Sequence, residues 1–223
     1  MTDEEKTVEK QKVTTRKRKS SSQARGDVRR SILVNAGKEL LATKPVEQLS
    51  LADVAKASDI PIGSVYHFFP KVNNLLAEIS KQFEQQIMEA VFQPFSLKPE
   101  DNWQAIIRAC VDRAVALYKE NRAYEQLLIG GKTPAEIKFS DRENDEEIGR
   151  SVMEALNEHF VMMPFANQEK VFFHTVEIID LMFMLSVNKH NEITDYMAEE
   201  AKRAAIAYLR CYMPEYLPKK ADE

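Results

Sequence analysis

The side chains best suited to recognition chemistry lie in residues 62–68, which read IGSVYHF. Ser64, Tyr66 and His67 bring a hydroxyl, a phenol and an imidazole close together, and Gly63 allows another backbone to approach. Such groups form hydrogen bonds with the base edges and phosphate oxygens of nucleic acids. The sequence contains no nucleophile–base pair, no metal-ligand spacing and no glycine-rich cofactor loop. We therefore expect binding rather than catalysis: no enzyme activity, no cofactor and no metal site.

The residues before this segment can place it in a helix-turn-helix. The Ser50 hydroxyl can accept a hydrogen bond from the Asp53 amide and so start a helix. Ala55 is small enough for two helices to cross steeply, and Asp59 stands where the backbone must reverse through the left-handed region. Pro61 suits the first position of the second helix. The predicted core of this unit consists of Leu51, Val54, Ile60, Val65 and Phe69.

The second helix leaves one face for a partner, and its size suits the major groove of DNA, which is about 12 Å wide. Ser64 and His67 would contact base edges or phosphates, and Tyr66 would donate its hydroxyl to a phosphate. An ordinary helical corner with a surface histidine is the alternative. The residues predicted to contact double-stranded DNA are Ser50, Pro61, Ile62, Gly63, Ser64, Tyr66, His67, Lys71, Arg25 and Arg29.

Charge is distributed unevenly along the 223 residues, whose net charge is −4. Residues 12–81 carry thirteen Lys and Arg against six Asp and Glu, whereas residues 82–223 carry sixteen against twenty-five. A basic N-terminal third on an acidic body is typical of a polyanion-binding module joined to another domain. We predict a disordered basic arm over 1–24, a helix-turn-helix domain over 25–72 and a second domain over 73–223. The arm would follow the DNA backbone or enter a minor groove; a solvated tail is the alternative.

Apolar and small residues recur at characteristic spacings through the basic third. They are Ile32, Leu33, Ala36 and Leu40, then Ser50, Leu51, Val54 and Ala55, then Ile60, Gly63, Val65, Tyr66 and Phe69, and finally Leu75 and Leu76. With this pattern, residues 28–76 resemble the DNA-binding domain of the TetR/AcrR family of transcriptional regulators. The resemblance implies that the last two long helices, about 168–189 and 193–213, pair with their two-fold mates in a homodimer.

The sequence departs from the family pattern in three ways. Asp59 stands where the family usually has Gly. Lys71 and Val72 replace a small or polar helix cap followed by Lys, so the expected phosphate-contacting lysine is displaced by one residue. Asn73 replaces the usual acid, which weakens support for the start of the next helix.

The rest of the chain has helical spacing, so we expect an all-α fold of about nine helices. Three closing helices are predicted at about 146–160, 168–189 and 193–213, after a loop over 132–144. No apolar run approaches the roughly 20 residues of a membrane span. Cys110 and Cys211 show no paired spacing and are expected to be reduced. These features favour a cytoplasmic protein that does not contact a membrane.

The C-terminal domain is expected to bind a mostly hydrophobic small molecule. His174, Glu177 and Asp180 recur at i, i+3 and i+6 in an otherwise apolar helix. They could form salt bridges between helices or subunits, anchor a ligand, or bind a metal; no second His or Cys cluster supports the last. The predicted effector contacts are Trp103, Ile107, Cys110, Phe160, Met163, Phe172, His174 and Glu177.

The expected dimer would hold two recognition helices at half-sites about one DNA turn apart. Helix 193–213 has a small face for close packing, formed by Ala198, Ala201, Ala204, Ala205 and Ala207. The function expected is that of a ligand-responsive regulator, a repressor, at a pseudo-palindromic operator. A helical DNA-binding protein without an effector, and a helical-bundle enzyme or carrier, are the alternatives.

Overall fold

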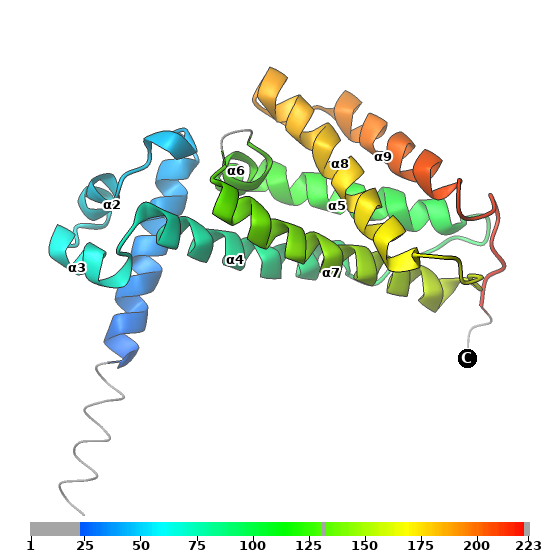
Figure 1. Ribbon diagram of the computed structural model, residues 1–223, viewed down its shortest axis with the longest axis horizontal. Coiled ribbons are helices and arrows are strands. Elements are labelled where there is room, and N and C mark those ends of the chain that lie inside the picture. The colour runs from blue at the N-terminus through cyan, green and yellow to red at the C-terminus, as the bar shows by residue number, and fades with distance from the viewer. Residues whose placement is uncertain (1–22, 131–132, 221–223) are drawn as a thin grey trace, which may run out of the picture.

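A computed structural model describes residues 23–130 and 133–220, and within these ranges the chain is helical without a β-strand, as predicted. Figure 1 shows a small head at one end of an elongated helical body. The head contains the first helix (residues 23–41), α2 (Leu51–Ser58) and α3 (Ile62–Phe68). The predicted arm over 1–24 lies almost wholly outside the described residues. The helix α4 (Val72–Val91) leads from the head into the body.

The helix-turn-helix forms where the sequence predicts it. The Asp53 amide donates to the Ser50 hydroxyl at 3.2 Å, and the Ser50 amide donates back to the Asp53 carboxylate at 3.3 Å. Asp59 ends α2 in the left-handed region with φ 54°. A short 3-10 turn, η1 (Val46–Gln48), joins the first helix to α2. Leu51, Val54, Val65 and Phe69 are buried as predicted, and Ile60 is partly buried.

The first helix packs closely on α4, because Gly37 lies at the contact. A Cβ at Gly37 would stand 3.1 Å from the side chains of both Leu75 and Ile79. Farther along, Arg30 and Glu78 form a two-pronged ion pair with nitrogen–oxygen distances of 3.2 and 2.8 Å. The first helix crosses α4, and these two contacts attach the head to it. The helix α4 packs on the first helix of the head and also on α5 and α7 of the body. The predicted domain boundary after residue 72 therefore stays a prediction.

The body consists of α5 (Trp103–Glu120), α6 (Arg122–Tyr124), a π-helical turn η2 (Glu125–Ile129), α7 (Ala135–His159), α8 (Gln168–His190) and α9 (Asp195–Leu209). In Figure 1, α4 and α5 lie behind α7 and α8, and α9 runs beside α8. The helix α8 packs against both α7 and α9. Its buried residues include Phe172, Val176 and Phe183.

By length and composition α8 could cross a membrane: it has 23 residues and its most apolar stretch has a mean hydropathy of 1.5. No stretch of this kind was expected from the sequence. A helix in the middle of a protein core has the same composition, and α8 is packed on two sides by α7 and α9. Only 39% of this stretch is buried within the subunit, so packing against α7 and α9 accounts for part of its hydropathy.

The predicted loop over 132–144 is wrong, because α7 begins at Ala135. This stretch reads AEIKFSDREN and is rich in residues that favour helices. Its polarity reflects exposure rather than irregular structure, since Glu136, Arg142 and Glu143 lie on the surface. A surface helix that buries only one narrow apolar stripe is mostly polar, so its composition resembles that of a loop.

Candidate functional site

The helix α3 presents the residues predicted to contact DNA on one outward face. Ile62 and Tyr66 leave 42% and 53% of their surface exposed, and His67 is exposed beside them. Ser64 is half-buried on the same helix. No atom lies within 4 Å of the position that a Cβ on Gly63 would take, so a partner backbone can approach there. The face combines hydrogen-bonding groups with apolar surface that the head leaves uncovered.

The opposite face of α3 holds it in place. Val65 and Phe69 are fully buried in the head, and the exposed Pro61 directly precedes the helix. A seven-residue helix is unstable alone, so this packing and the α2 turn fix its orientation. The face is thus presented by a rigid support, which recognition of a base sequence requires.

Ser50 differs from the other predicted contacts because its hydroxyl is already engaged. Its Oγ donates to the Asp53 carboxylate at 2.7 Å, and Lys44 Nζ lies 2.6 Å from the same carboxylate. Hydrogen bonds from Lys44 and then Ser50 hold the pKa of Asp53 below its usual range. Ser50 therefore orients α2 as a cap, and any contact it makes with DNA would use the remaining lone pair of Oγ.

Three arginines of the first helix divide into two groups. Arg25 and Arg29 are exposed, as expected for phosphate contacts. Arg30 instead pairs with Glu78 and lies over the Phe69 ring, 4.9 Å from its centre. Its guanidinium lowers the pKa of the Glu78 carboxyl. Arg30 thus joins the first helix, α3 and α4 rather than serving the outer surface.

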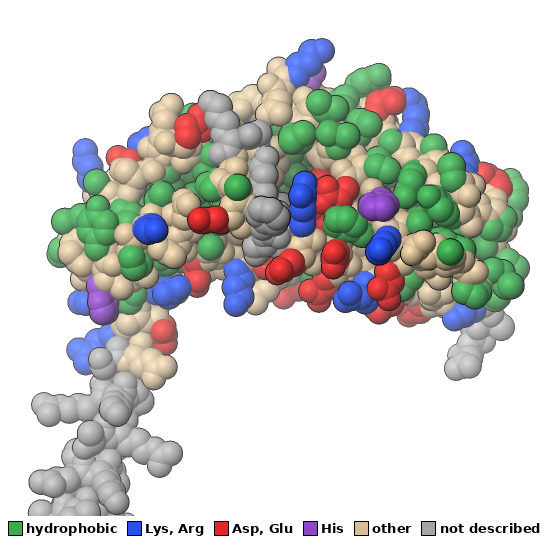
Figure 2. Space-filling model, viewed as in Figure 1, with side chains coloured by type: hydrophobic (Ala, Val, Ile, Leu, Met, Phe, Trp, Pro, Cys, Tyr) green, Lys and Arg blue, Asp and Glu red, His purple; other side chains and the backbone are tan. Residues whose placement is uncertain are grey.

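Lys71, the displaced lysine, is exposed at the start of α4. Its amide donates to the side-chain carbonyl of Asn74 at 3.0 Å, so a residue one turn ahead supplies the cap that the sequence lacks at position 71. Figure 2 shows Lys and Arg side chains around the head and Asp and Glu side chains gathered along the middle of the body. The charge division along the sequence is therefore also a division in space.

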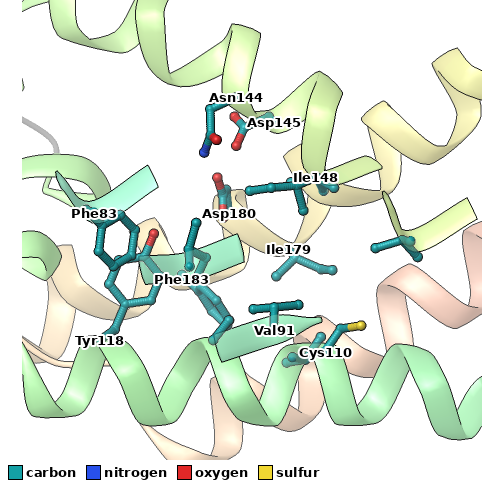
Figure 3. Close-up of a pocket in the computed structure, with 15 residues that line it drawn as sticks. Phe83, Val91, Cys110, Tyr118, Asn144, Asp145, Ile148, Ile179, Asp180 and Phe183 are labelled. Carbon is teal, nitrogen blue, oxygen red and sulfur yellow. The ribbon is translucent and has the colours of Figure 1, made fainter. Parts of the chain in front are cut away.

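A second candidate site is a cavity of about 60 Å³ inside the body, between α4, α5, α7 and α8. Figure 3 shows its side chains: Val91, Cys110, Ile148 and Ile179 form apolar walls. Burial raises the pKa of the Cys110 thiol to about 12, so this group is a neutral, apolar part of the wall.

Only Cys110 among the predicted effector contacts lines this cavity. Trp103 is fully buried and donates its indole N–H to the Pro214 carbonyl at 3.0 Å, which ties α5 to the C-terminal segment. Phe160 is buried, and its backbone forms an isolated antiparallel β-bridge with Lys219 of the same C-terminal segment. Ile107 and Phe172 are buried elsewhere in the core, and Met163 leaves 74% of its surface exposed.

The three polar residues of α8 separate in space. His174 Nδ1 lies 3.1 Å from the Tyr208 hydroxyl on the surface of α9. Glu177 lies 3.6 Å from Arg142 of α7. Asp180 lines the cavity. Of the interpretations that the sequence allows, salt bridging suits Glu177 and a polar ligand anchor suits Asp180.

Sequence reasoning missed most of the cavity lining. Asn144 ends the segment predicted as a loop, and Asp145 lies directly after it, before the helix predicted over 146–160. The helix α7 turns both toward the cavity. Phe83 and Tyr118 belong to apolar stripes. Such stripes predict that a residue is buried but not whether it lines a cavity or packs in the filled core. Besides Cys110, the signal for this place was Asp180, a charge within an apolar helix.

Contacts connect the cavity to the head. Phe83 of the cavity wall packs on Tyr124 with ring centres 4.5 Å apart. Lys38 of the first helix lies 5.6 Å from the centre of the Tyr124 ring and 3.4 Å from its hydroxyl. At a second contact, the side-chain amide of Asn73 donates to the Glu136 carboxylate of α7 at 3.1 Å. Movement of the cavity wall therefore has a short path to the first helix.

Comparison with known proteins agrees with this architecture. Residues 33–79 match the model of bacterial regulatory proteins of the tetR family, and residues 101–213 match that of the tetracyclin repressor-like C-terminal domain. No curated protein matches the chain in sequence.

Solved structures share the fold. A TetR-family transcriptional regulator from Streptomyces coelicolor is 21% identical, with a TM-score of 0.64 over 84% of this chain and 98% of that one. RolR in complex with resorcinol is 16% identical, with a TM-score of 0.58 over 85% and 89%. The dihydroxyacetone kinase operon activator DhaS is 14% identical, with a TM-score of 0.54 over 83% and 98%. The two family models, one on the head and one on half of the chain, show that this protein belongs to the TetR family of DNA-binding transcriptional regulators.

Proposed function

We propose that the protein is a ligand-responsive repressor that binds a pseudo-palindromic operator as a homodimer. The observation that carries this proposal is the outward face of α3, whose Tyr66 and His67 project from a buried support with Gly63 open to close approach. Ile62, Ser64, Tyr66 and His67 would meet the major groove, and Arg25, Arg29 and Lys71 the phosphates. Ser50 and Pro61 would fix the approach of the two helices.

The dimer would form through the outer faces of α8 and α9. His174, Ile178, Leu181 and Leu185 follow one another along α8 at helical spacing, and Leu181 and Leu185 leave 47% and 48% of their surface exposed. Only Ala204 and Ala207 of the α9 alanines reach this side. Ala198, Ala201 and Ala205 are buried within the subunit, where they let α9 approach α8 closely.

The cavity between α4, α5, α7 and α8 would bind the effector. Its apolar walls suit a small hydrophobic molecule, and a structural neighbour, RolR, is complexed with the small aromatic molecule resorcinol. An effector would act only by binding better to a conformation with displaced heads. The contacts from Phe83 through Tyr124 to Lys38 support such coupling. The regulator would act in the cytoplasm, where its DNA is.

Three alternatives differ from this proposal in their observable behaviour. DhaS, an operon activator, shares the fold, so activation is the second candidate for the direction of control. A DNA-binding protein without an effector would keep its affinity for DNA whatever small molecule is added. A helical-bundle enzyme or carrier would bind no genomic fragment specifically.

Selection of genomic fragments by the purified protein, followed by a reporter fused to the nearest promoter, tests the proposal. We expect enrichment of a site with two-fold symmetry, binding of one dimer per site, and a lower reporter signal when the regulator is present. A higher signal would replace repression with activation. Failure to enrich any fragment over bulk DNA would contradict the function itself.

A further inference from the structure

One end of the cavity is built from aromatic rings. Phe83, Tyr118 and Phe183 line it together, with ring centres 4.9 Å apart for Phe83 and Tyr118 and 6.1 Å apart for Tyr118 and Phe183. They come from three different helices, α4, α5 and α8, and are held by packing in the core. Aromatic faces attract cations placed within about 6 Å of a ring centre, especially where water is excluded.

Carboxylates lie beside these rings. Asp145 of α7 and Asp180 of α8 line the cavity with the amide of Asn144, and Figure 3 shows Asp180 next to Phe183. Asp145 is buried and Asp180 half-buried. Among the described residues that line the cavity, none is Lys, Arg or His. The polar side of the cavity therefore offers hydrogen-bond acceptors and negative charge.

The same two aspartates also line a groove on the outside of the body, with Leu181 and Met184. They therefore stand between the inner cavity and this groove. Arg142 borders that groove and is matched by Glu177, 3.6 Å away. Asp145 and Asp180 each take part in a further polar interaction, so a ligand would share them rather than find them idle.

We propose that this cavity recognises a small lipophilic ammonium ion, with its charge between the two aspartates and the aromatic rings and its apolar part against Val91, Cys110 and Ile179. The inference deepens the proposed function, on which it rests, by naming the chemical class of the effector. Carboxylates alone would also suit a neutral hydrogen-bond donor, but rings and carboxylates together favour a cation.

The size of the cavity supplies the link to regulation. A volume of about 60 Å³ corresponds to roughly two water molecules. A ligand with a larger apolar group must displace the residues that line the cavity. One of these is Phe83, which contacts Tyr124. Such a ligand binds the widened conformation preferentially, which is the condition for shifting the position of the head.

Calorimetric titration of the full-length protein with three molecules of matched shape tests the charge preference. Benzylammonium is the cation, benzyl alcohol the neutral donor and benzoate the anion. We expect benzylammonium to bind about tenfold or more tightly than benzyl alcohol, because only the cation gains from rings and carboxylates together, and benzoate to bind weakest.

Variants locate the effect. Asp180→Asn and Asp145→Asn should each lower the affinity for benzylammonium about tenfold while leaving that for benzyl alcohol nearly unchanged, which also reports an intact cavity. Glu158→Gln removes the same charge from a groove at the far end of α7 and should change neither affinity.

Any of four results would overturn the inference. These are equal affinities for the three molecules, a preference for benzoate, no binding of benzylammonium up to roughly 10 mM, and selectivity for the cation that survives both aspartate variants. A gel shift with selected DNA separates this outcome from failure of the proposed function. DNA binding without cation selectivity removes only the effector class. Cation selectivity without DNA binding removes the regulator and leaves the cavity's preference standing.

Discussion

A Tyr66→Phe, His67→Ala double variant is expected to bind selected operator DNA on the order of 100-fold more weakly than the parent in a gel shift. Both side chains are exposed on α3, so the substitutions remove two hydrogen-bonding groups without opening the core of the head. A dimer loses these groups at both half-sites, which doubles the loss of binding free energy. Affinity for unrelated DNA should fall much less, since phosphate contacts by Arg25 and Arg29 remain.

A Tyr216→Phe, His190→Ala double variant is the matched control. It changes the same residue types at exposed positions of the body, where Tyr216 leaves 77% of its surface exposed. We expect parental affinity. If the α3 variant also bound the operator as tightly as the parent, α3 would not be the recognition helix.

A Gly149→Ala variant is expected to lower the free energy of unfolding by about 1–3 kcal/mol, because α7 crosses α8 at this glycine. A Cβ there would stand 2.8 Å from the Phe173 nitrogen and 2.9 Å from the Phe172 carbonyl carbon. These are backbone atoms of α8, which cannot swing aside as a side-chain end can. The two helices must separate, and the cavity between them must change shape. Urea unfolding measures the loss.

Gly26→Ala is a control that is expected to change the free energy of unfolding in the opposite direction. No atom lies within 4 Å of its would-be Cβ, and it stands in the first helix, where alanine favours helix by up to about 1 kcal/mol. We expect a small gain in stability there. A gain of similar size for Gly149→Ala would show that α7 and α8 do not meet this closely.

The head could be predicted from the sequence because its structure is set locally. The Ser50 cap, the left-handed turn at Asp59 and the inward position of Val65 each depend on neighbours a few residues away. Residue types at fixed spacings specify such features without knowledge of the rest of the fold. The outward face of α3 follows by elimination once the inward residues are assigned.

The cavity could not be predicted in the same way. Its lining comes from four helices, and a residue such as Phe83 has the same helical spacing whether it faces a cavity or fills the core. Trp103 and Phe160 were expected there, but the C-terminal segment covers them. Trp103 contacts a residue more than a hundred positions away, and Phe160 pairs with one about sixty positions away. The polar composition of residues 132–144 concealed the start of α7, and with it Asn144 and the adjoining Asp145. Cys110, one of the predicted effector contacts, and the charge of Asp180 within an apolar helix were the two signals that marked the place in advance.

Dimethyl sulfate footprinting of the complex with a selected operator tests the placement of α3 most directly, because the reagent methylates guanine N7 in the major groove. With α3 in the major groove, we expect protection in two patches on one face of the duplex, centred about one helical turn apart. Both patches should be lost with the Tyr66→Phe, His67→Ala variant. A stable complex in which every guanine N7 stays reactive would contradict this placement.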